Sequence, residues 1–130
     1  MIYLDAGPIM RLIAGPADLR KQVRDLMTEG RSVTSVIRVT ECQTKPYQDS
    51  NTEAIRLFAD FFKSADIRLI VVSDMIADAA AGIRSRYRLK TPDALHLATA
   101  LIAGCELFVT TDRHFDRCRD AGVAIHIVSA

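Results

Sequence analysis

The sequence predicts one α/β domain in which a mainly parallel sheet lies between two layers of helices. Short runs rich in β-branched residues alternate along the chain with longer segments of helical periodicity. Alternating strands and helices are typical of a parallel sheet covered on both faces. The length of 130 residues, 49% of them hydrophobic, is enough for one buried core. We therefore expect a single three-layer α/β/α domain over residues 1–130, with no second domain or repeat.

The first segments of the chain predict a strand and two helices. Residues 2–5 (IYLD) form a short apolar run that ends on Asp5. A short helix follows from Gly7, and a second helix over residues 17–29 has apolar side chains at helical spacing and stops at Gly30. The sheet is thus expected to begin at the N-terminus.

The segment from residue 31 to residue 42 (RSVTSVIRVTEC) has two interpretations. Its β-branched residues favour a strand, which the alternation of side chains extends as far as Thr40. Alternatively, Ser35 caps a helix, which places Ile37 and Glu41 one turn apart on the same face. The residues alone leave both interpretations open.

The middle of the chain predicts a loop, a helix, a strand and a further helix. Residues 45–51 (KPYQDSN) have the composition of a loop, and Ser50 with Glu53 resembles a capping box before an amphipathic helix. Residues 67–72 (IRLIVV) form the next strand, and Ser73 caps the helix after it. These elements continue the alternation of strands and helices.

The stretch from Lys90 to Asp112 (KTPDALHLATALIAGCELFVTTD) predicts a buried helix followed by a buried strand. Thr91 is a suitable helix cap, Pro92 suits the first turn, and Gly104 ends the helix. A helix this apolar is covered on most sides. We expect His96 either to line a functional site or to join the core. Only three polar side chains interrupt its surface, namely Asp93, His96 and Thr99.

The end of the chain predicts one short helix between two strands. Residues 106–110 (ELFVT) and 123–128 (VAIHIV) are the expected strands, and the helix between them runs from Arg113 to Gly122. The first of these strands leads directly into Asp112, which therefore follows its carboxyl end.

Four carboxylates are predicted to meet at one edge of the sheet. Asp5 ends the first strand and Asp112 follows the fourth, and the carboxyl ends of parallel strands share an edge. Asp93 begins a helix that must run back antiparallel to the strands, so the crossover rule puts it at the same edge. Glu41 joins them if its segment is helical. Each acid also has a simpler role, as a helix cap, a partner of the helix dipole or a solvated side chain.

A cluster of carboxylates without a cation is electrostatically unfavourable. Two like charges about 4 Å apart repel by roughly 4 kcal/mol at an effective dielectric constant of about 20. A divalent cation removes this repulsion, and oxygen ligands without a set of His or Cys favour Mg²⁺ or Mn²⁺ over zinc. Such an ion suits phosphodiester hydrolysis, because it lowers the pKa of bound water and offsets charge on the phosphoryl oxygens.

Composition and charge place few limits on the partners of the protein. The net charge of +1 neither indicates nor excludes nucleic acid, since binding depends on where the charge lies. Three cysteines without a C-x-x-C pair indicate packed thiols in a reducing compartment. No apolar run approaches the roughly 20 residues of a membrane span, and no signal-peptide pattern is present. We therefore expect a cytoplasmic protein without a membrane partner.

Four segments of the chain resemble a known family. The resemblance is to PIN domains, in particular the single-domain VapC-type toxins of type II toxin–antitoxin pairs. It implies a five-stranded, mainly parallel sheet and a metal-dependent endoribonuclease, and it extends over nearly the whole chain. The segments are IYLDAGPIM, SVIRVTE, KTPDALHLATAL and LFVTTDRHF.

The resemblance also implies the residues of the site. The four acids of the family, which bind Mg²⁺ or Mn²⁺ for catalysis, correspond to Asp5, Glu41, Asp93 and Asp112. Because the family carries its second acid on a helix, the resemblance favours the helical interpretation around Glu41. The hydroxyl that precedes the last acid and orients the site corresponds to Thr110.

The implied substrate is RNA, either single-stranded or transfer RNA, cleaved to 5′-phosphate and 3′-hydroxyl ends. RNA is held mainly through its phosphates, and Lys90 and Arg113 are the basic residues nearest the predicted site. The implied protein partners are a small cognate antitoxin and a second copy of the chain in a homodimer.

Two positions depart from the family pattern. Gly7 stands where members usually carry Ser, Thr or Asn, and His114 stands where many carry another acid. The alternative interpretation is therefore a catalytically impaired PIN fold that acts as a protein- or RNA-binding module. Retention of all four acids favours the enzyme.

Overall fold

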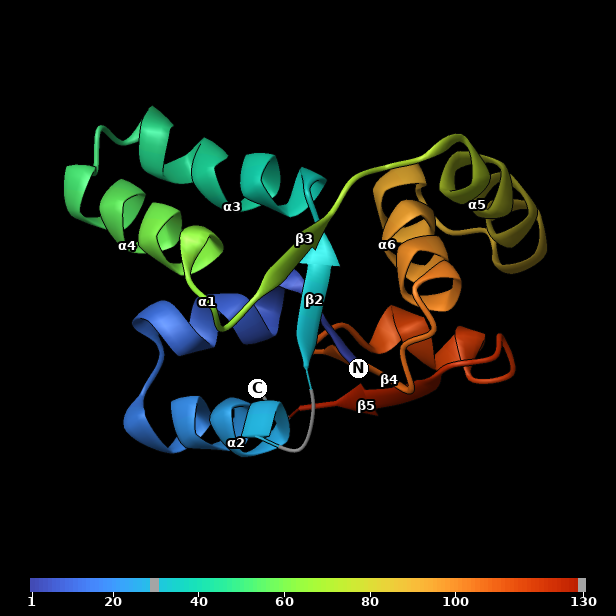
Figure 1. Ribbon diagram of the computed structural model, residues 1–130, viewed down its shortest axis with the longest axis horizontal. Coiled ribbons are helices and arrows are strands. Elements are labelled where there is room, and N and C mark those ends of the chain that lie inside the picture. The colour runs from blue at the N-terminus through green and yellow to red at the C-terminus, as the bar shows by residue number, and fades with distance from the viewer. Residues whose placement is uncertain (29–30, 129–130) are drawn as a thin grey trace.

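A five-stranded parallel sheet forms the centre of the computed structural model, which describes residues 1–28 and 31–128 (Figure 1). The strands lie in the order β3-β2-β1-β4-β5, and every neighbouring pair is parallel. This confirms the predicted fold class. The strands are β1 (Ile2–Leu4), β2 (Ser32–Ser35), β3 (Arg68–Ile70), β4 (Leu107–Thr110) and β5 (Ala124–Ile127).

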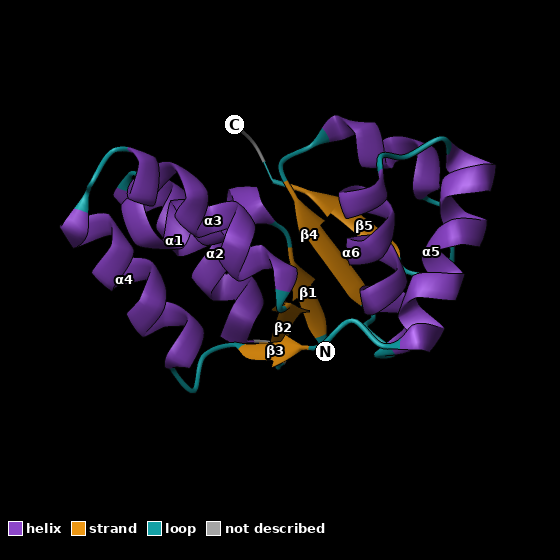
Figure 2. Ribbon diagram, turned by 90° about the horizontal axis from the view of Figure 1, so that it is seen from above, coloured by secondary structure: helices purple, strands orange, loops and turns teal. Residues whose placement is uncertain are grey.

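Helices cover both faces of the sheet, as predicted. The first four helices lie on one face, and α5 and α6 lie on the other (Figure 2). None of the helices within the described ranges is both long and apolar enough to cross a membrane. The helices are α1 (Ala6–Ala14), α2 (Ala17–Thr28), α3 (Ile37–Gln48), α4 (Thr52–Lys63), α5 (Asp74–Tyr87), α6 (Thr91–Ile102) and the 3₁₀ helix η1 (Arg113–Cys118).

Two hydrophobic clusters, one on each face, hold these layers together. Successive side chains of a strand point to opposite faces, so Tyr3 joins the cluster under α5 and α6 while Leu4 joins the cluster under α1–α4. Phe108 and Val109 of β4 divide in the same way. All three cysteines are free and buried, in agreement with the expected packed thiols.

Strand β1 occupies the middle of the sheet and connects its two halves. It pairs with β2 on one side and with β4 on the other, where Tyr3 is opposite Phe108. The backbone N–H of Asp5 continues this pairing and donates to the carbonyl of Val109 at 2.9 Å. The ends of β1 and β4 are thereby fixed next to each other.

The ambiguous segment is a strand followed by a helix. Strand β2 ends at Ser35, and α3 begins at Ile37, so the strand that alternation extended to Thr40 was wrong. The Ser35 hydroxyl accepts a hydrogen bond from the Ile37 N–H at 3.3 Å, close to the capping role considered for it. Glu41 lies on α3, which confirms the helical interpretation.

The predicted loop over residues 45–51 was mostly wrong, because α3 continues through Pro46 to Gln48. Pro46 is buried in the packing of this helix, and tertiary contacts therefore override its low helix propensity. The capping box was also misplaced. Asn51 caps α4 by accepting from the Ala54 N–H at 3.1 Å, whereas Ser50 has a φ of 49°, outside the extended region that an N-cap adopts.

Other helix and strand ends differ from the predictions by a few residues. Ser73 caps α5 as predicted, but Thr91 is the first residue of α6 and Lys90 precedes it as the N-cap. Strand β3 is shorter than predicted, and η1 ends at Cys118 rather than near Gly122. Helix α2 reaches Thr28, and its predicted stop at Gly30 lies outside the described residues.

Candidate active site

Asp5 anchors the candidate site at the carboxyl end of β1. Its residue is only 8% exposed, so its carboxylate must find partners within the protein. Each oxygen has one: Oδ1 accepts from Nη2 of Arg38 at 2.6 Å, and Oδ2 accepts from the Thr110 hydroxyl at 2.6 Å. Two charge-assisted hydrogen bonds therefore fix the orientation of this carboxylate.

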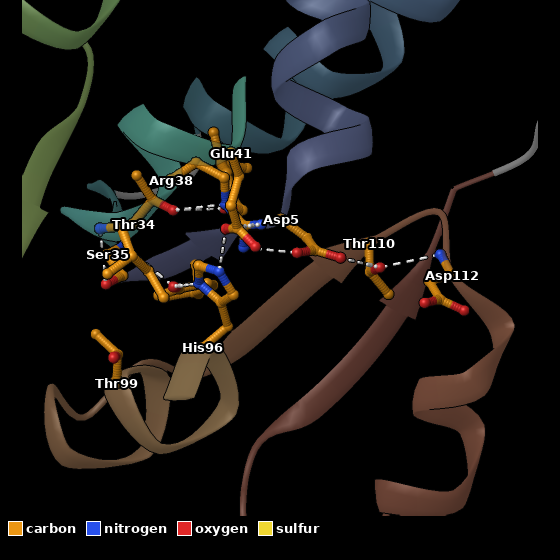
Figure 3. A network of polar contacts seen from close by, with 12 residues as sticks. Asp5, Thr34, Ser35, Arg38, Glu41, His96, Thr99, Thr110 and Asp112 are labelled. Atoms are coloured by element: carbon orange, nitrogen blue, oxygen red, sulfur yellow. Dashed lines mark hydrogen bonds and ion pairs between the residues drawn. The ribbon is translucent and has the colours of Figure 1, made fainter. Parts of the chain in front are cut away.

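Thr110 connects Asp5 to Asp112, the acid expected after β4. The Thr110 side chain is fully buried, donates to Asp5 and accepts from the Asp112 backbone N–H at 3.0 Å (Figure 3). The Thr110 hydroxyl therefore bridges the Asp5 carboxylate and the backbone of Asp112.

Glu41 lies on α3, one turn after Arg38. Its Oε1 accepts from Nη1 of Arg38 at 3.1 Å and from Nε2 of His96 at 2.5 Å. Burial alone would raise the pKa of Glu41, but the hydrogen bond from His96 and the attraction of His96 and Arg38 outweigh it. The pKa of Glu41 therefore lies below its ordinary value.

His96 links the helix α6 to the first strand. Its ring is 1% exposed, and its Nδ1 is 2.5 Å from the Tyr3 hydroxyl, which also accepts from the Ser35 N–H at 3.0 Å. Burial raises the pKa of Tyr3 to about 12, so its hydroxyl keeps its proton at neutral pH. When the ring is neutral, Tyr3 donates to Nδ1 and Nε2 donates to Glu41. His96 thus lies between Tyr3 and Glu41, beside the candidate site.

Arg38 is the residue of the candidate site that the sequence analysis missed. It is 2% exposed, although arginine is rarely buried without a charged partner, and it bridges Asp5 and Glu41. Its spacing of three residues before Glu41 on a helix was the available signal, because such pairs meet on one face. Its contact with Asp5 was not readable from the sequence, since it joins two distant segments.

Asp93 lies in the first turn of α6, as predicted. No described residue donates a hydrogen bond to its carboxylate. Its pKa is raised, first by burial and then by the negative charges of Asp5 and Asp112, with a smaller contribution from Glu41. The four predicted acids are therefore within electrostatic reach of one another.

Asp112 has the capping role that was its simpler interpretation. Its Oδ1 accepts from the His114 backbone N–H at 2.9 Å and lies 2.8 Å from Nδ1 of the His114 ring. Asp116, two residues after His114, pairs with Arg119 and is exposed. Capping orients the Asp112 carboxylate and leaves its second oxygen available.

The two candidate substrate contacts are exposed. Lys90 precedes α6, and Arg113 follows Asp112 with a side chain that is 80% exposed. Arg113 also lines an open cavity of about 480 Å³ together with Asp112 and His114. Of the arginines near α5, Arg86 pairs with Asp120 at 2.8 Å.

The donor set suits a hard divalent cation by its chemistry. Carboxylate oxygens are the ligands that Mg²⁺ and Mn²⁺ prefer. Over residues 1–28 and 31–128, however, no three His, Cys, Asp or Glu side chains form a ready-made metal cluster. Arg38 holds two of the acids, so the set fits a divalent ion in composition but does not enclose one in this arrangement.

The comparisons with known proteins agree with this fold. A family model described as PIN domain matches residues 2–121. None of the curated proteins matches the chain in a sequence comparison.

Several solved structures share the fold at low sequence identity. VapBC2 from Rickettsia felis, bound to a DNA fragment from its promoter, has a TM-score of 0.78 and 19% identity over 98% of each chain. VapC20 from Mycobacterium tuberculosis, described as a toxin that cleaves the sarcin–ricin loop, has a TM-score of 0.73 and 20% identity over 95% of this chain and 97% of its own. A toxin–antitoxin complex from Klebsiella pneumoniae has a TM-score of 0.68 and 21% identity, covering 88% and 90%.

Proposed function

Because the chain belongs to the PIN-domain family, we propose that it is a metal-dependent endoribonuclease and the toxin of a VapBC-type toxin–antitoxin pair. A chain of hydrogen bonds joins Glu41, Arg38, Asp5, Thr110 and Asp112, and this arrangement carries the proposal. Its acids come from separate segments of the sequence. This is expected of a functional site, whereas a residue that only caps a helix contacts its own segment. The toxin–antitoxin proteins among the structural neighbours support the same assignment.

The proposed metal ligands are the carboxylates of Asp5, Glu41, Asp93 and Asp112, and the proposed ion is Mg²⁺ or Mn²⁺. Such an ion, when bound, supplies a water of lowered pKa and neutralises charge on the phosphoryl group. Two observations favour these ligands: hydrogen bonds connect Asp5 through Thr110 to the backbone of Asp112, and Asp93, whose pKa is raised first by burial, also feels the charges of Asp5, Asp112 and Glu41.

The side chains of the protein have distinct tasks in this proposal. Thr110 and Arg38 orient the Asp5 carboxylate, and His96 with Arg38 keeps Glu41 ionised. Lys90, which precedes the helix of Asp93, and Arg113, which follows Asp112, bind phosphates of the RNA. Orientation before the substrate arrives reduces the reorganisation that the reaction requires.

The proposed substrate is single-stranded or transfer RNA, and the proposed protein partners are a cognate antitoxin and a second copy of the chain. We place the protein in the cytoplasm, where such an RNA target is found. Binding of RNA through phosphates does not require a strongly basic protein, provided that the basic residues lie beside the site.

Cleavage of a mixed pool of single-stranded and transfer RNA tests this function. The wild-type protein should cut RNA in Mg²⁺ or Mn²⁺ and not in chelator, and Asp93→Asn should abolish cutting. Asp74→Asn is the matched control, because Asp74 also lies in the first turn of a helix but is exposed on α5. Equal loss of activity in both variants would show that Asp93 acts only on its helix.

The alternative function is a PIN fold that binds protein or RNA without cleaving it. The absence of a ready-made metal cluster among the described residues is the observation that favours it. A well-folded protein that binds RNA with equal affinity in Mn²⁺ and in chelator, and cuts none of the pool, would establish this alternative.

A further inference from the structure

Arg38 presents an unusual combination of burial and charge. Its side chain is 3% exposed, and all three of its guanidinium nitrogens face polar atoms of the protein. Nη2 donates to Asp5 at 2.6 Å, Nη1 donates to Glu41 at 3.1 Å, and Nε lies 3.5 Å from the Thr34 hydroxyl. A charge this deeply buried is maintained only where its partners compensate for the loss of water.

The Thr34 hydroxyl faces the Nε end of the Arg38 guanidinium. It is fully buried and donates to the Leu4 carbonyl at 2.9 Å, directly before Asp5. The guanidinium therefore spans two strands and a helix: β2 through Thr34, the end of β1 through Asp5, and α3 through Glu41. The planar fork of arginine suits this task, whereas the ammonium of lysine has no comparable fork.

The same two carboxylates belong to the proposed metal ligands. Without Arg38, Asp5 would be a nearly buried anion that retains one neutral partner, the Thr110 hydroxyl. It would also face the charges of the other acids, which already act on Asp93. The positive charge of Arg38 therefore contacts two of the carboxylates expected to bind the metal, and it reaches them from α3.

We propose that Arg38 is a positioning residue that supplies, within the chain, the positive charge that holds Asp5 and Glu41 in place before a divalent ion binds. The fold of the wild-type protein is then independent of metal, and the metal adds little to its stability. Replacement of Arg38 by a neutral side chain transfers part of the compensation to the metal, so that the stability of the protein becomes more dependent on metal. This inference rests on the metal site of the proposed function.

Thermal unfolding in chelator and in Mn²⁺ tests the proposal through stability, not activity. In chelator, Arg38→Met should lower the melting temperature by on the order of 10 °C, because it leaves a buried carboxylate without its partner. Mn²⁺ should then raise the melting temperature of Arg38→Met roughly twice as much as that of the wild type. A purely structural role predicts the same loss with and without Mn²⁺, and that result would overturn the proposal.

Two further variants keep the test decisive. Arg38→Lys preserves the charge, so its melting temperature in chelator should be closer to the wild type than that of Arg38→Met. Equal losses for both variants would assign the effect to packing and overturn the proposal. If Arg38→Met does not fold, Arg38→Met combined with Asp5→Asn should fold in chelator, because it removes both charges. Failure of this double variant to fold would also overturn it.

Calorimetric titration of Mn²⁺ into the wild type separates this inference from the proposed function. Suppose that the wild type binds Mn²⁺, that Asp93→Asn does not, and that Mn²⁺ raises the melting temperature of Arg38→Met no more than that of the wild type. This result would support the metal site and refute the role of Arg38. No binding to the wild type would refute the metal site and, with it, the role of Arg38.

Discussion

The Thr111 side chain fills the space that a side chain at Gly7 would occupy. A Cβ atom built on Gly7 would lie 2.0 Å from the Thr111 Oγ1 and 2.8 Å from its Cγ2. Gly7 is the second residue of α1, and Thr111 follows β4, so the contact joins the two chain segments that carry Asp5 and Asp112. The departure from the family pattern at Gly7 is therefore matched by a hydroxyl-bearing residue at the same place.

Gly7→Ala should destabilise the protein by about 1–3 kcal/mol, as expected for overpacking at a closely packed position. Thr111→Ala should restore part of this loss by removing Oγ1 and Cγ2, and Thr111→Gly should restore more, since the Thr111 Cβ also lies within 2.9 Å. Urea denaturation of the single and double variants measures the coupling. Additive effects of the two substitutions would contradict the shared space.

Asp93→Asn should leave the stability of the metal-free protein unchanged or raise it by about 1 kcal/mol or less, because repulsion and burial both disfavour the ionised carboxylate. Asp74→Asn should lower stability slightly, since Asp74 lies exposed in the first turn of α5 and its negative charge interacts favourably with the helix dipole. Chemical denaturation in chelator at about pH 7 compares the two variants. A larger loss for Asp93→Asn than for Asp74→Asn would identify Asp93 as a helix-stabilising residue.

The benefit of Asp93→Asn should depend on pH. The pKa of Asp93 is raised in the folded state, so the folded protein binds this proton more tightly and loses stability as the pH rises through the raised value. The gain in stability of Asp93→Asn over the wild type is therefore expected at pH values above the raised pKa of Asp93. It should vanish below about pH 4, where Asp93 is protonated in both the folded and the unfolded protein. Denaturation of both proteins across this range measures the difference, and a gain that persists in acid would exclude titration of Asp93 as its cause.

Tyr3→Phe should destabilise the protein by about 1–3 kcal/mol, because it leaves the buried Ser35 N–H without its acceptor and removes the hydroxyl bonded to His96. The aromatic stacking on Phe108, with ring centroids 5.1 Å apart, should remain. Tyr87→Phe is the control, since it also removes a hydroxyl from a contact, but its partner, the Asp120 carboxylate, is exposed. Equal losses in urea denaturation would show that the buried contacts of Tyr3 contribute nothing beyond a surface hydrogen bond.

Replacement of Lys90 and Arg113 by alanine should weaken RNA binding and reduce its dependence on salt. Each phosphate contact to a single strand contributes a slope of about 0.7 in the logarithm of affinity against that of salt concentration. The matched control replaces Arg31 and Arg68, which lie at the amino ends of β2 and β3 and therefore at the opposite edge of the sheet. Fluorescence anisotropy with labelled RNA measures both slopes. A similar change in both double variants would indicate a general effect of charge.

Local periodicity is enough to predict the sheet, its covering helices and the edge at which Asp5, Asp93 and Asp112 gather. Strand ends and crossover directions follow from general rules that do not require side-chain contacts. Helix caps were predicted less well, because Ser50 and Asn51 have similar capping propensities and only the backbone conformation distinguishes them.

The electrostatic partners within the site were not predictable from the sequence. Arg38 is one of many arginines, and its burial depends on α3 packing beside the end of β1. The contact between Tyr3 and His96 joins residues 93 positions apart, and no local pattern indicates it. Periodicity therefore locates the acids, whereas tertiary packing determines what orients them.

The central place of β1 has a consequence for how the protein is made on the ribosome. The first strand is synthesised before its partner β4 and before the Thr110 hydroxyl, which lies 105 positions after Asp5. A nascent chain that stops before β4 has β1 paired on one side only, and it carries Asp5 without Thr110 or Asp112. Incomplete chains of this kind therefore cannot assemble the candidate site.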